Sequence, residues 1–455
     1  MDEKTLIREI EEHRDEYIEF LKRMIQVDTY NPPGNEKNLV PLIKEYLEEE
    51  NIDCEVFPFQ ENRANLLATL NKNAKGSTLL LNGHMDVVPP GNKEEWKYEP
   101  LLAFQKRKKY IYGRGAADMK GGLAAMIITL KLLKKLQIET SGNLILNAVS
   151  DEETGGEYGT GWCMEHLLEE RNIKTDFCII GEPTGLSPLP KAVILGEKGH
   201  LQVKIICNGI SCHASMPEMG KNAIYMMNEI IQNLPKLEEY IPKVEPPLTV
   251  EELQDLVAVS FPSKDIFLKI YNEQELLQNV VASLTKFTYA FTVVHAGIKE
   301  NVVPDNCEGI IDFRLIPGQS TEMILDGLKK IIQDDLGYEI RENCKGKPED
   351  IFVCLEIFHQ SDPSIWEEWK DSEELKEFYS VVEEVYKKKP FYFLFPACAD
   401  AHYLRNGGYC PQTILFGPGS ASTAHSVDEF IEIEDFINCI KAYALFAYKF
   451  LTQAE

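Results

Sequence analysis

Short apolar segments alternate with longer helix-forming segments in the first part of this sequence, and this alternation limits the available folds more than any other feature. STLLLNG, NLILNAVS and FCIIG are predicted strands. GWCMEHLLEERN is a predicted helix, as is MKGGLAAMIITLKLLKKL, which begins at Met119. The alternation predicts an α/β unit whose largely parallel sheet is covered by helices on both faces.

The pattern of apolar and polar residues changes near residue 195. LQVKIIC alternates apolar and polar residues, which predicts a strand with one face in solvent. After it come a predicted helix, two strands, a second helix and a last strand, an order that favours an α+β sandwich. The α/β pattern returns near residue 372. Because 455 residues are too many for one ordinary domain, we predict one domain from residues 1–194 and 363–455, with a second domain inserted at 195–362.

Charge and hydropathy argue against two classes of partner. Lys and Arg total 47 and Asp and Glu total 73, so the net charge of −26 would repel phosphate backbones and anionic lipid. The acidic N-terminal segment has no apolar core of a secretory signal, and no apolar run approaches the ~20 residues that a membrane helix needs. We therefore expect no nucleic-acid partner and no membrane partner.

The 11 cysteines are scattered along the chain, and no two of them form a C-x-x-C pair. This pattern favours free thiols in a reducing cytosol over a disulfide framework, and its spacing excludes a four-cysteine zinc site. We therefore expect a cytoplasmic protein with free thiols.

Side chains of the kind that bind metals follow the predicted strands. They are His84 and Asp86 after TLLLNG, the acidic run 151–153 after LILNAVS, Glu182 after CIIG and His425 after TILFGPGSASTA, with Asp118 at the start of the Met119 helix. In open α/β sheets, ligands bind beyond the carboxyl ends of the strands. Several carboxylates gathered there would repel one another without a cation, and histidines with carboxylates are the ligands of open zinc sites. Two ions that share a bridging carboxylate would offset this charge best.

Each of these segments has a simpler interpretation on its own. His84 could be an ordinary loop histidine, and SDEETGGEYGTG could be a solvated acidic loop. GRGAADMKGG could be an ordinary glycine-rich loop before a helix. It lacks the remaining glycine of a dinucleotide-binding motif and the G-K-[ST] step of a phosphate-binding loop. Because all these loops carry ligand-type side chains beside predicted strands or helices, their joint interpretation as a metal centre is favoured.

Seven ordered motifs resemble those of one metallopeptidase family. They are GHMDVVPPG, YGRGAADMKGG, SDEETGGEYGT, GEPTG, SCHASMPEMGKNA, NVVPDNCEGIIDFRLIPG and GPGSASTAHSVDEF. Their order and spacing resemble the family of acetylornithine deacetylase and succinyl-diaminopimelate desuccinylase, with aminoacylase and bacterial glutamate carboxypeptidase as relatives. The likeness covers nearly the whole chain. It implies a zinc-peptidase-like catalytic domain with a mixed sheet, and an inserted α+β sandwich that serves as lid and dimerisation domain.

The resemblance implies five metal ligands, namely His84, Asp118, Glu153, Glu182 and His425. Asp118 would bridge two zinc ions, Glu153 and His425 would complete one metal site, and Glu182 would complete the other. Cobalt and manganese suit the same ligands.

The resemblance also implies catalytic roles beside the metals. Glu152 would be the general base, and Asp86 would hold the ring of His84 by its other nitrogen. The peptide between Asp118 and Met119 is cis in this family, so we expect a cis bond here. His213 would reach from the partner subunit of a homodimer and donate a hydrogen bond to the oxyanion, although a surface histidine is the simpler interpretation.

Three further residues match positions that hold substrate in the family, namely Asn301, Arg314 and Asp400. For Arg314, a surface ion pair is the alternative. The segment FPACADAHYLRNGG departs from the family pattern, because His402 stands where an arginine is common. Arg405 could substitute for that arginine, and His402 could be a satisfied loop residue. The region 235–285 is longer than compact relatives need and would shape the pocket entrance or extend the lid.

The expected function is therefore that of a dinuclear zinc amidohydrolase acting on an N-acyl amino acid or a short peptide, as a homodimer. Met119 after Asp118 favours a deacylase or carboxypeptidase, since dipeptidases of this family more often carry a second aspartate there. A metallo-dipeptidase or carboxypeptidase and a non-catalytic binding relative are the alternatives. The acyl group, the amino acid and the native metal stay open.

Overall fold

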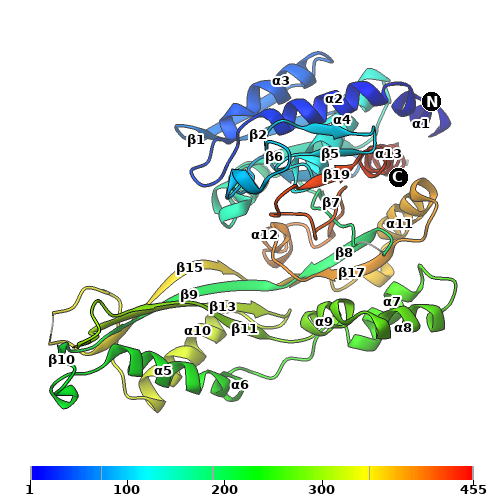
Figure 1. Cartoon of the computed structure of the whole chain (residues 1–455). Helices are drawn as coiled ribbons and strands as arrows, with labels where there is room; N and C mark the ends of the chain where they lie inside the picture. Colours follow the sequence, from blue (N-terminus) through cyan, green and yellow to red (C-terminus); the bar gives the residue numbers. More distant parts are fainter. Residues whose placement is uncertain (1–2, 73, 187–188, 348, 453–455) are drawn as a thin grey trace.

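The computed structural model describes residues 3–452 apart from 73, 187–188 and 348. Two large sheets dominate these residues (Figure 1). The larger sheet has nine strands, in the order β1-β2-β6-β3-β7-β18-β8-β16, with β17 also paired to β8. Its strands are β1 (Cys54–Gln60), β2 (Arg63–Leu70), β3 (Thr78–His84), β6 (Asn143–Val149), β7 (Phe177–Ile180), β8 (Ala192–Glu197), β16 (Ser364–Ile365), β17 (Phe391–Phe395) and β18 (Thr413–Leu415).

The nine-stranded sheet is mixed, as the resemblance implied. Strands β6, β3, β7 and β18 run parallel to one another, whereas the pairs made by β1, β2 and β16 are antiparallel. The sheet is thus less parallel than strand–helix alternation alone predicts. The reason is local, because only residues 61–62 separate β1 from β2 and a tight turn joins strands in the antiparallel sense.

Successive side chains of the buried strands enter different cores. Leu79 and Leu81 belong to one hydrophobic cluster, and Leu80 between them belongs to another. This explains the continuous leucine run, since both faces of the strand are covered. The first face is covered by α1 (Glu3–Glu12), α2 (Arg14–Gln26), α3 (Val40–Glu48), α4 (Lys120–Lys135), α11 (Glu373–Tyr386) and α13 (Ile433–Thr452).

The second face is covered by α12 (Ala401–Asn406) together with α7 (Val250–Ala258), α8 (Lys264–Glu273) and α9 (Glu275–Leu284). Helices α7 to α9 come from the extended region 235–285, and Val257 and Phe267 share a core with Leu80. This region therefore covers the nine-stranded sheet, although it lies within the sequence range predicted for the inserted domain. The domain boundaries themselves remain a prediction.

The smaller sheet has five strands in the order β11-β13-β9-β15-β14. They are β9 (Gly199–Asn208), β11 (Thr288–Ala296), β13 (Asn306–Leu315), β14 (Ile340–Arg341) and β15 (Phe352–Ser361). In the first half of β9 buried and half-buried residues alternate, so the predicted strand with one wetter face is confirmed. Helices α5 (Ala223–Asn233), α6 (Leu237–Tyr240) and α10 (Thr321–Lys330) pack on the apolar face. β8 leads directly into β9, so one extended path joins the two sheets (Figure 1).

Short pairings complete the fold. β4 (Phe104–Lys106), β5 (Tyr110–Tyr112) and β19 (Phe430–Glu432) form a three-stranded sheet, and β10 (Cys212–His213) pairs with β12 (Val302–Val303). None of the helices in the part of the chain that the structure describes combines the length and the apolar composition needed to cross a bilayer.

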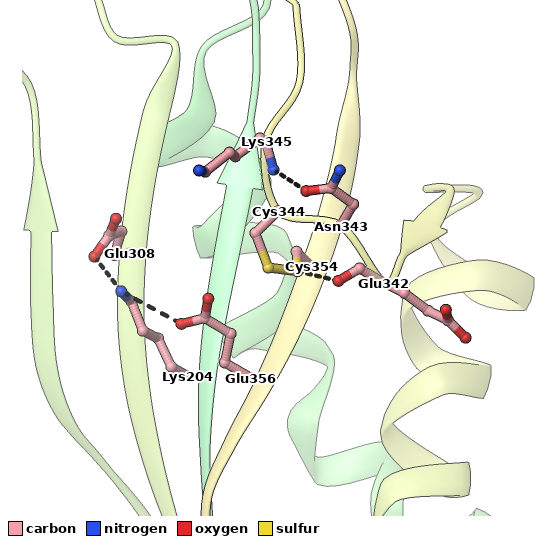
Figure 2. Close-up of a disulfide and its surroundings, with 8 residues drawn as sticks. All are labelled: Lys204, Glu308, Glu342, Asn343, Cys344, Lys345, Cys354 and Glu356. Atoms are coloured by element: carbon pink, nitrogen blue, oxygen red, sulfur yellow. Dashed lines mark hydrogen bonds and ion pairs between the residues drawn. A yellow bond between two sulfur atoms is a disulfide. The ribbon is translucent and has the colours of Figure 1, made fainter.

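A disulfide joins Cys344 to Cys354, so the expectation that all thiols are free is wrong for this pair. The two Cα atoms lie 5.3 Å apart, within the ordinary range for a disulfide. Figure 2 shows the disulfide near β9, where Lys204 lies between two carboxylates on the neighbouring strands. The remaining nine cysteines are free. Spacing along the sequence did not reveal the pair, because the parallel pairing of β14 with β15 brings the two segments together.

Candidate metal centre

Two histidines from distant parts of the chain converge on Asp118. His84 ends β3, and its Nε2 lies 3.1 Å from Oδ1 of Asp118. His425 follows β18, and its Nε2 lies 3.3 Å from Oδ2 of the same carboxylate. Each oxygen of Asp118 therefore faces a different imidazole. This arrangement suits a carboxylate that bridges two metal ions.

Two carboxylates complete these groups. Oε1 of Glu182 lies 3.6 Å from Nε2 of His84, and Oε2 of Glu153 lies 3.0 Å from Nε2 of His425. His84, Asp118 and Glu182 form one set able to hold a metal ion, and Asp118, Glu153 and His425 form another; a third possible set is His84, Glu152 and Glu153. The ligand atoms of each set lie within 4.8 Å of one another. The side chains that we expected to bind metal thus lie together, in two sets that share Asp118.

The topology explains this convergence. β6, β3 and β7 are parallel neighbours, so the loops that follow them emerge at the same edge of the sheet. The start of α4 is pressed against that edge, since a Cβ on Gly122 would lie only 2.0 Å from the main-chain oxygen of Gly181. The peptide between Asp118 and Met119 is cis, which confirms that expectation. Close packing of α4 on the strand ends therefore places Asp118 beside His84 and Glu182.

The electrostatics of the cluster are those of crowded carboxylates. Burial raises the pKa of Glu152 and of Glu182 well above the usual range, and neighbouring negative charges add to the effect. Burial acts in the same direction on Asp118, but hydrogen bonds from His425 and His84 together outweigh it and hold its pKa below the usual value. The centre therefore favours added positive charge, because a cation would keep all these carboxylates ionised.

The residues present suit a divalent metal ion. Nδ1 of His84 lies 2.9 Å from the main-chain oxygen of Asp86, so this nitrogen must donate and Nε2 keeps its lone pair for a ligand. Oε1 of Glu182 is buried and has no hydrogen-bond partner within the described residues. Imidazole nitrogens with carboxylate oxygens are the donors that open catalytic metal sites use.

Asp86 contacts Nδ1 of His84, the ring nitrogen that faces away from Asp118, mainly through its main chain. Its main-chain oxygen, rather than its carboxylate, makes the short contact with His84, while Oδ1 lies 3.5 Å from the ring. Oδ2 accepts hydrogen bonds from Nδ2 of Asn31 at 2.9 Å and from the main-chain N–H of Glu153 at 3.1 Å. Asp86 thus joins the His84 loop to the Glu153 loop.

A cavity of about 300 Å³ lies between the metal-ligand cluster and the five-stranded sheet. Its walls include Glu152, Glu153 and His425 on one side, and residues of β9, β13 and β15 on the other. The latter are His200, Arg314 and His359. The volume is that of a site for a small molecule.

Two of the predicted substrate residues line this cavity. Nε and Nη2 of Arg314 donate to Asp312 at 2.8 and 3.3 Å, so the ion pair and the cavity position coexist. Asp400 is buried and its Oδ2 accepts a hydrogen bond from Thr160 at 2.6 Å. Burial raises the pKa of Asp400 to about 7.

His402 also lines the cavity, and its Nδ1 donates to the main-chain oxygen of Ala399 at 2.8 Å. His402 is therefore hydrogen-bonded within its own loop, as one interpretation expected, and it also faces the cavity, as a substrate-binding residue would. Arg405 does not line the cavity. Its guanidinium donates to the main-chain oxygen of Thr413 and to Oγ of Ser364, so it does not replace the missing arginine.

The structure does not bring His213 and Asn301 to the cavity. They lie next to each other, because β10 pairs with β12 and the N–H of Ala214 donates to the oxygen of Asn301. Both side chains are exposed. Figure 1 shows β10 at the end of the five-stranded sheet that is far from the nine-stranded sheet.

Several residues near the centre were missed by the sequence reasoning. Glu429 accepts hydrogen bonds from the N–H groups of Ala117 and Asp118, at 2.8 and 3.0 Å, and pairs with Arg114. Its place in the motif GPGSASTAHSVDEF was a usable signal. His200 and His359 had no such signal, since each lies inside a strand that reads as ordinary sheet.

Comparisons with known proteins agree with this geometry. Residues 80–449 match the profile described as "Peptidase family M20/M25/M40". A protein of Staphylococcus aureus strain MSSA476, named "Probable succinyl-diaminopimelate desuccinylase", is 28% identical over 445 residues, which cover 96% of this chain and 98% of that protein.

Two solved structures share the fold over nearly their whole length. An M20 family metallo-carboxypeptidase from Sulfolobus solfataricus has a TM-score of 0.76 at 22% identity, with 96% of this chain and 99% of that chain covered. A di-peptidase from Saccharomyces cerevisiae has a TM-score of 0.74 at 15% identity, with 100% and 99% covered. At identities this low, the likeness shows a shared fold and does not by itself show a shared activity.

Proposed function

We propose a substrate class for this chain, which belongs to peptidase family M20/M25/M40 and is a metal-dependent amide hydrolase. The proposed reaction removes the acyl group from an N-acyl amino acid or a related small amide. The observation that carries the proposal is the Asp118 carboxylate, with an imidazole at each oxygen and an acidic residue beside each imidazole. The name of the Staphylococcus aureus relative, a desuccinylase, favours an acylated amino acid as the substrate.

The proposed cofactors are two zinc ions, with cobalt or manganese as alternatives for the same ligands. His84, Asp118 and Glu182 would hold one ion, and Asp118, Glu153 and His425 would hold the other. When bound, the ions would polarise the amide carbonyl and make water a stronger nucleophile.

Glu152 is the proposed general base. It lines the cavity, and its Oε2 lies 3.9 Å from Nε2 of His84. Burial raises its pKa, which suits a carboxylate that accepts a proton from water and passes it to the departing amine. Glu153 differs from its neighbour, since its oxygens contact His425 and the N–H of Val88.

The opposite wall of the cavity is proposed to hold the substrate. The guanidinium of Arg314 would bind the carboxylate of the amino acid, and its ion pair with Asp312 fixes its orientation. Asp400 would contribute to the same substrate site, because it lines the cavity and its hydrogen bond from Thr160 fixes its position.

We further propose a homodimer in which His213 of one subunit completes the site of the other. Three observations support it. His213 and Asn301 are exposed and distant from the cavity of their own chain. β11 is an edge strand of the five-stranded sheet, and α5 exposes Ile224, Tyr225 and Ile231.

A dipeptidase or carboxypeptidase with the same metal centre is the second candidate, because a metallo-carboxypeptidase and a di-peptidase share this fold. An activity screen with added zinc or cobalt separates the candidates. The panel contains acetyl, succinyl and formyl amino acids, and unblocked dipeptides of the same amino acids. Preferential hydrolysis of the acylated compounds supports the proposal, and preference for free dipeptides overturns the deacylase assignment.

A further inference from the structure

A buried arginine from the start of β2 lies between two acidic residues that bind no metal in the proposed site. Nη2 of Arg63 donates to Oε1 of Glu36 at 2.6 Å and to Oδ1 of Asp151 at 3.0 Å. Nε of Arg63 lies 3.2 and 3.1 Å from the two oxygens of Glu36. Glu36 is fully buried and only 9% of the Arg63 side chain is exposed.

The surrounding backbone is shaped to hold this guanidinium. Gly34 has a positive φ of 92°, and a Cβ there would lie 2.4 Å from Nε of Arg63. The ring of Phe59 lies on another side, with its centroid 5.3 Å from Cζ. Glycine at position 34 is therefore required both by the backbone conformation and by the close approach of Arg63.

Asp151 connects the guanidinium of Arg63 to the loop that carries Glu152 and Glu153. It immediately precedes Glu152 and Glu153 and has a positive φ of 77°, an uncommon conformation for a residue other than glycine. Its Oδ1 also accepts a hydrogen bond from Oγ1 of Thr154 at 2.7 Å, and its Oδ2 accepts one from the N–H of Tyr158 at 3.1 Å. The turn that directs Glu152 and Glu153 toward the cavity is thus built around the Asp151 carboxylate.

A second link runs from the same N-terminal segment to the metal ligands. Nδ2 of Asn31 donates both to Oδ2 of Asp86, at 2.9 Å, and to Oγ1 of Thr154, at 3.0 Å. Asp86 in turn accepts from the N–H of Glu153. The segment YNPPGNE therefore contacts the Glu152–Glu153 loop through Asn31 and, by way of Glu36 and Arg63, through Asp151.

We propose that Arg63, fixed by Glu36, is a positioning residue that sets the Glu152–Glu153 loop for metal binding and proton transfer. This inference rests on the proposed function, since it concerns the same loop. An ion pair that only stabilises the fold would need neither an acceptor in the catalytic turn nor the left-handed backbone at Asp151. Loss of Arg63 would leave two buried carboxylates uncompensated and free the turn to relax.

Zinc affinity, measured by chelator competition on the full chain, tests this proposal together with the visible spectrum of the cobalt-loaded protein. Arg63→Met is expected to weaken zinc binding by roughly 10- to 100-fold, the usual effect of losing an outer partner of a metal site. It should also change the cobalt spectrum and lower kcat at saturating metal more than it raises KM. Arg63→Lys keeps the charge and should recover part of the affinity.

Lys131→Met is the matched control. Lys131 is also 9% exposed and pairs with Glu49 at 2.5 Å, on the part of α4 remote from the metal ligands. It should lower the melting temperature and leave zinc affinity and the cobalt spectrum unchanged. Asp151→Asn keeps the size of the side chain but removes the charge that pairs with Arg63, so it should also weaken zinc binding. It decides the question if Arg63→Met does not fold.

Wild-type zinc affinity and cobalt spectrum in both Arg63→Met and Asp151→Asn would overturn the inference, whatever their melting temperatures. That result would leave the proposed function intact. A wild-type protein that binds neither metal would instead contradict the proposed function.

Discussion

Replacing Glu152 with glutamine removes one carboxylate from the centre and keeps its shape. The amide fills the same volume and cannot accept a proton from water. General acid–base catalysis contributes roughly 100- to 10,000-fold, so kcat should fall by that factor, which corresponds to about 3–5 kcal/mol of transition-state stabilisation.

Metal binding should survive this change, because Glu152 belongs to neither of the two sets that share Asp118. It occurs only in a third possible set, with His84 and Glu153, and both of those residues also belong to one of the sets that share Asp118. Burial and its acidic neighbours raise the pKa of Glu152, so replacing it also relieves like-charge repulsion. We therefore expect KM and zinc affinity to stay near the wild-type values.

The assay measures kcat, KM and bound zinc for Glu152→Gln beside Glu153→Gln. The second variant is the matched control, because Glu153 contacts His425 at 3.0 Å and its loss should release metal. Our reasoning is refuted if Glu152→Gln retains full kcat, or if it loses metal as readily as Glu153→Gln does.

Three further predictions concern the frame of the site. Gly122→Ala places a Cβ against the main-chain oxygen of Gly181, so it should lower both the melting temperature and the bound zinc; an unchanged metal content would contradict the close packing of α4. Arg314→Met should raise KM for substrates with a free carboxylate and spare kcat, which steady-state kinetics with carboxylate and amide forms of one substrate will show. Burial raises the pKa of Asp312, but hydrogen bonds from His200 and Arg314 outweigh it and lower the pKa to about 2. The stability that Asp312 contributes is therefore present above pH ~4 and lost as the pH falls toward 2. Denaturant unfolding of wild type and Asp312→Asn should accordingly differ at pH 5 and converge near pH 2.

The clustering of the candidate metal-ligand residues was predictable because its signal is local. Each follows an apolar run or begins an apolar helix, and parallel strands bring such ends to one edge. The buried strand β3 and the alternating strand β9 were predictable for the same reason, since the pattern of apolar residues shows whether one or both faces of a strand are buried. The mixed character of the sheet was implied only by the family resemblance.

Features that depend on distant pairing were not predictable. The region 235–285 stood out by its length, but the sequence did not show which sheet it covers; its helices α7 to α9 cover the nine-stranded sheet. Cys344 and Cys354 meet only because β14 pairs with β15. Arg63 begins an ordinary strand, and its role depends on Glu36 and Asp151 meeting it from separate segments.

The metal content of the purified protein tests the central claim most directly. Elemental analysis after dialysis against zinc should give two ions per chain for the wild type. Asp118→Asn should bind at most one ion weakly, because Asp118 faces both histidines. Two tightly held ions in Asp118→Asn, or no bound metal in the wild type, would contradict the account.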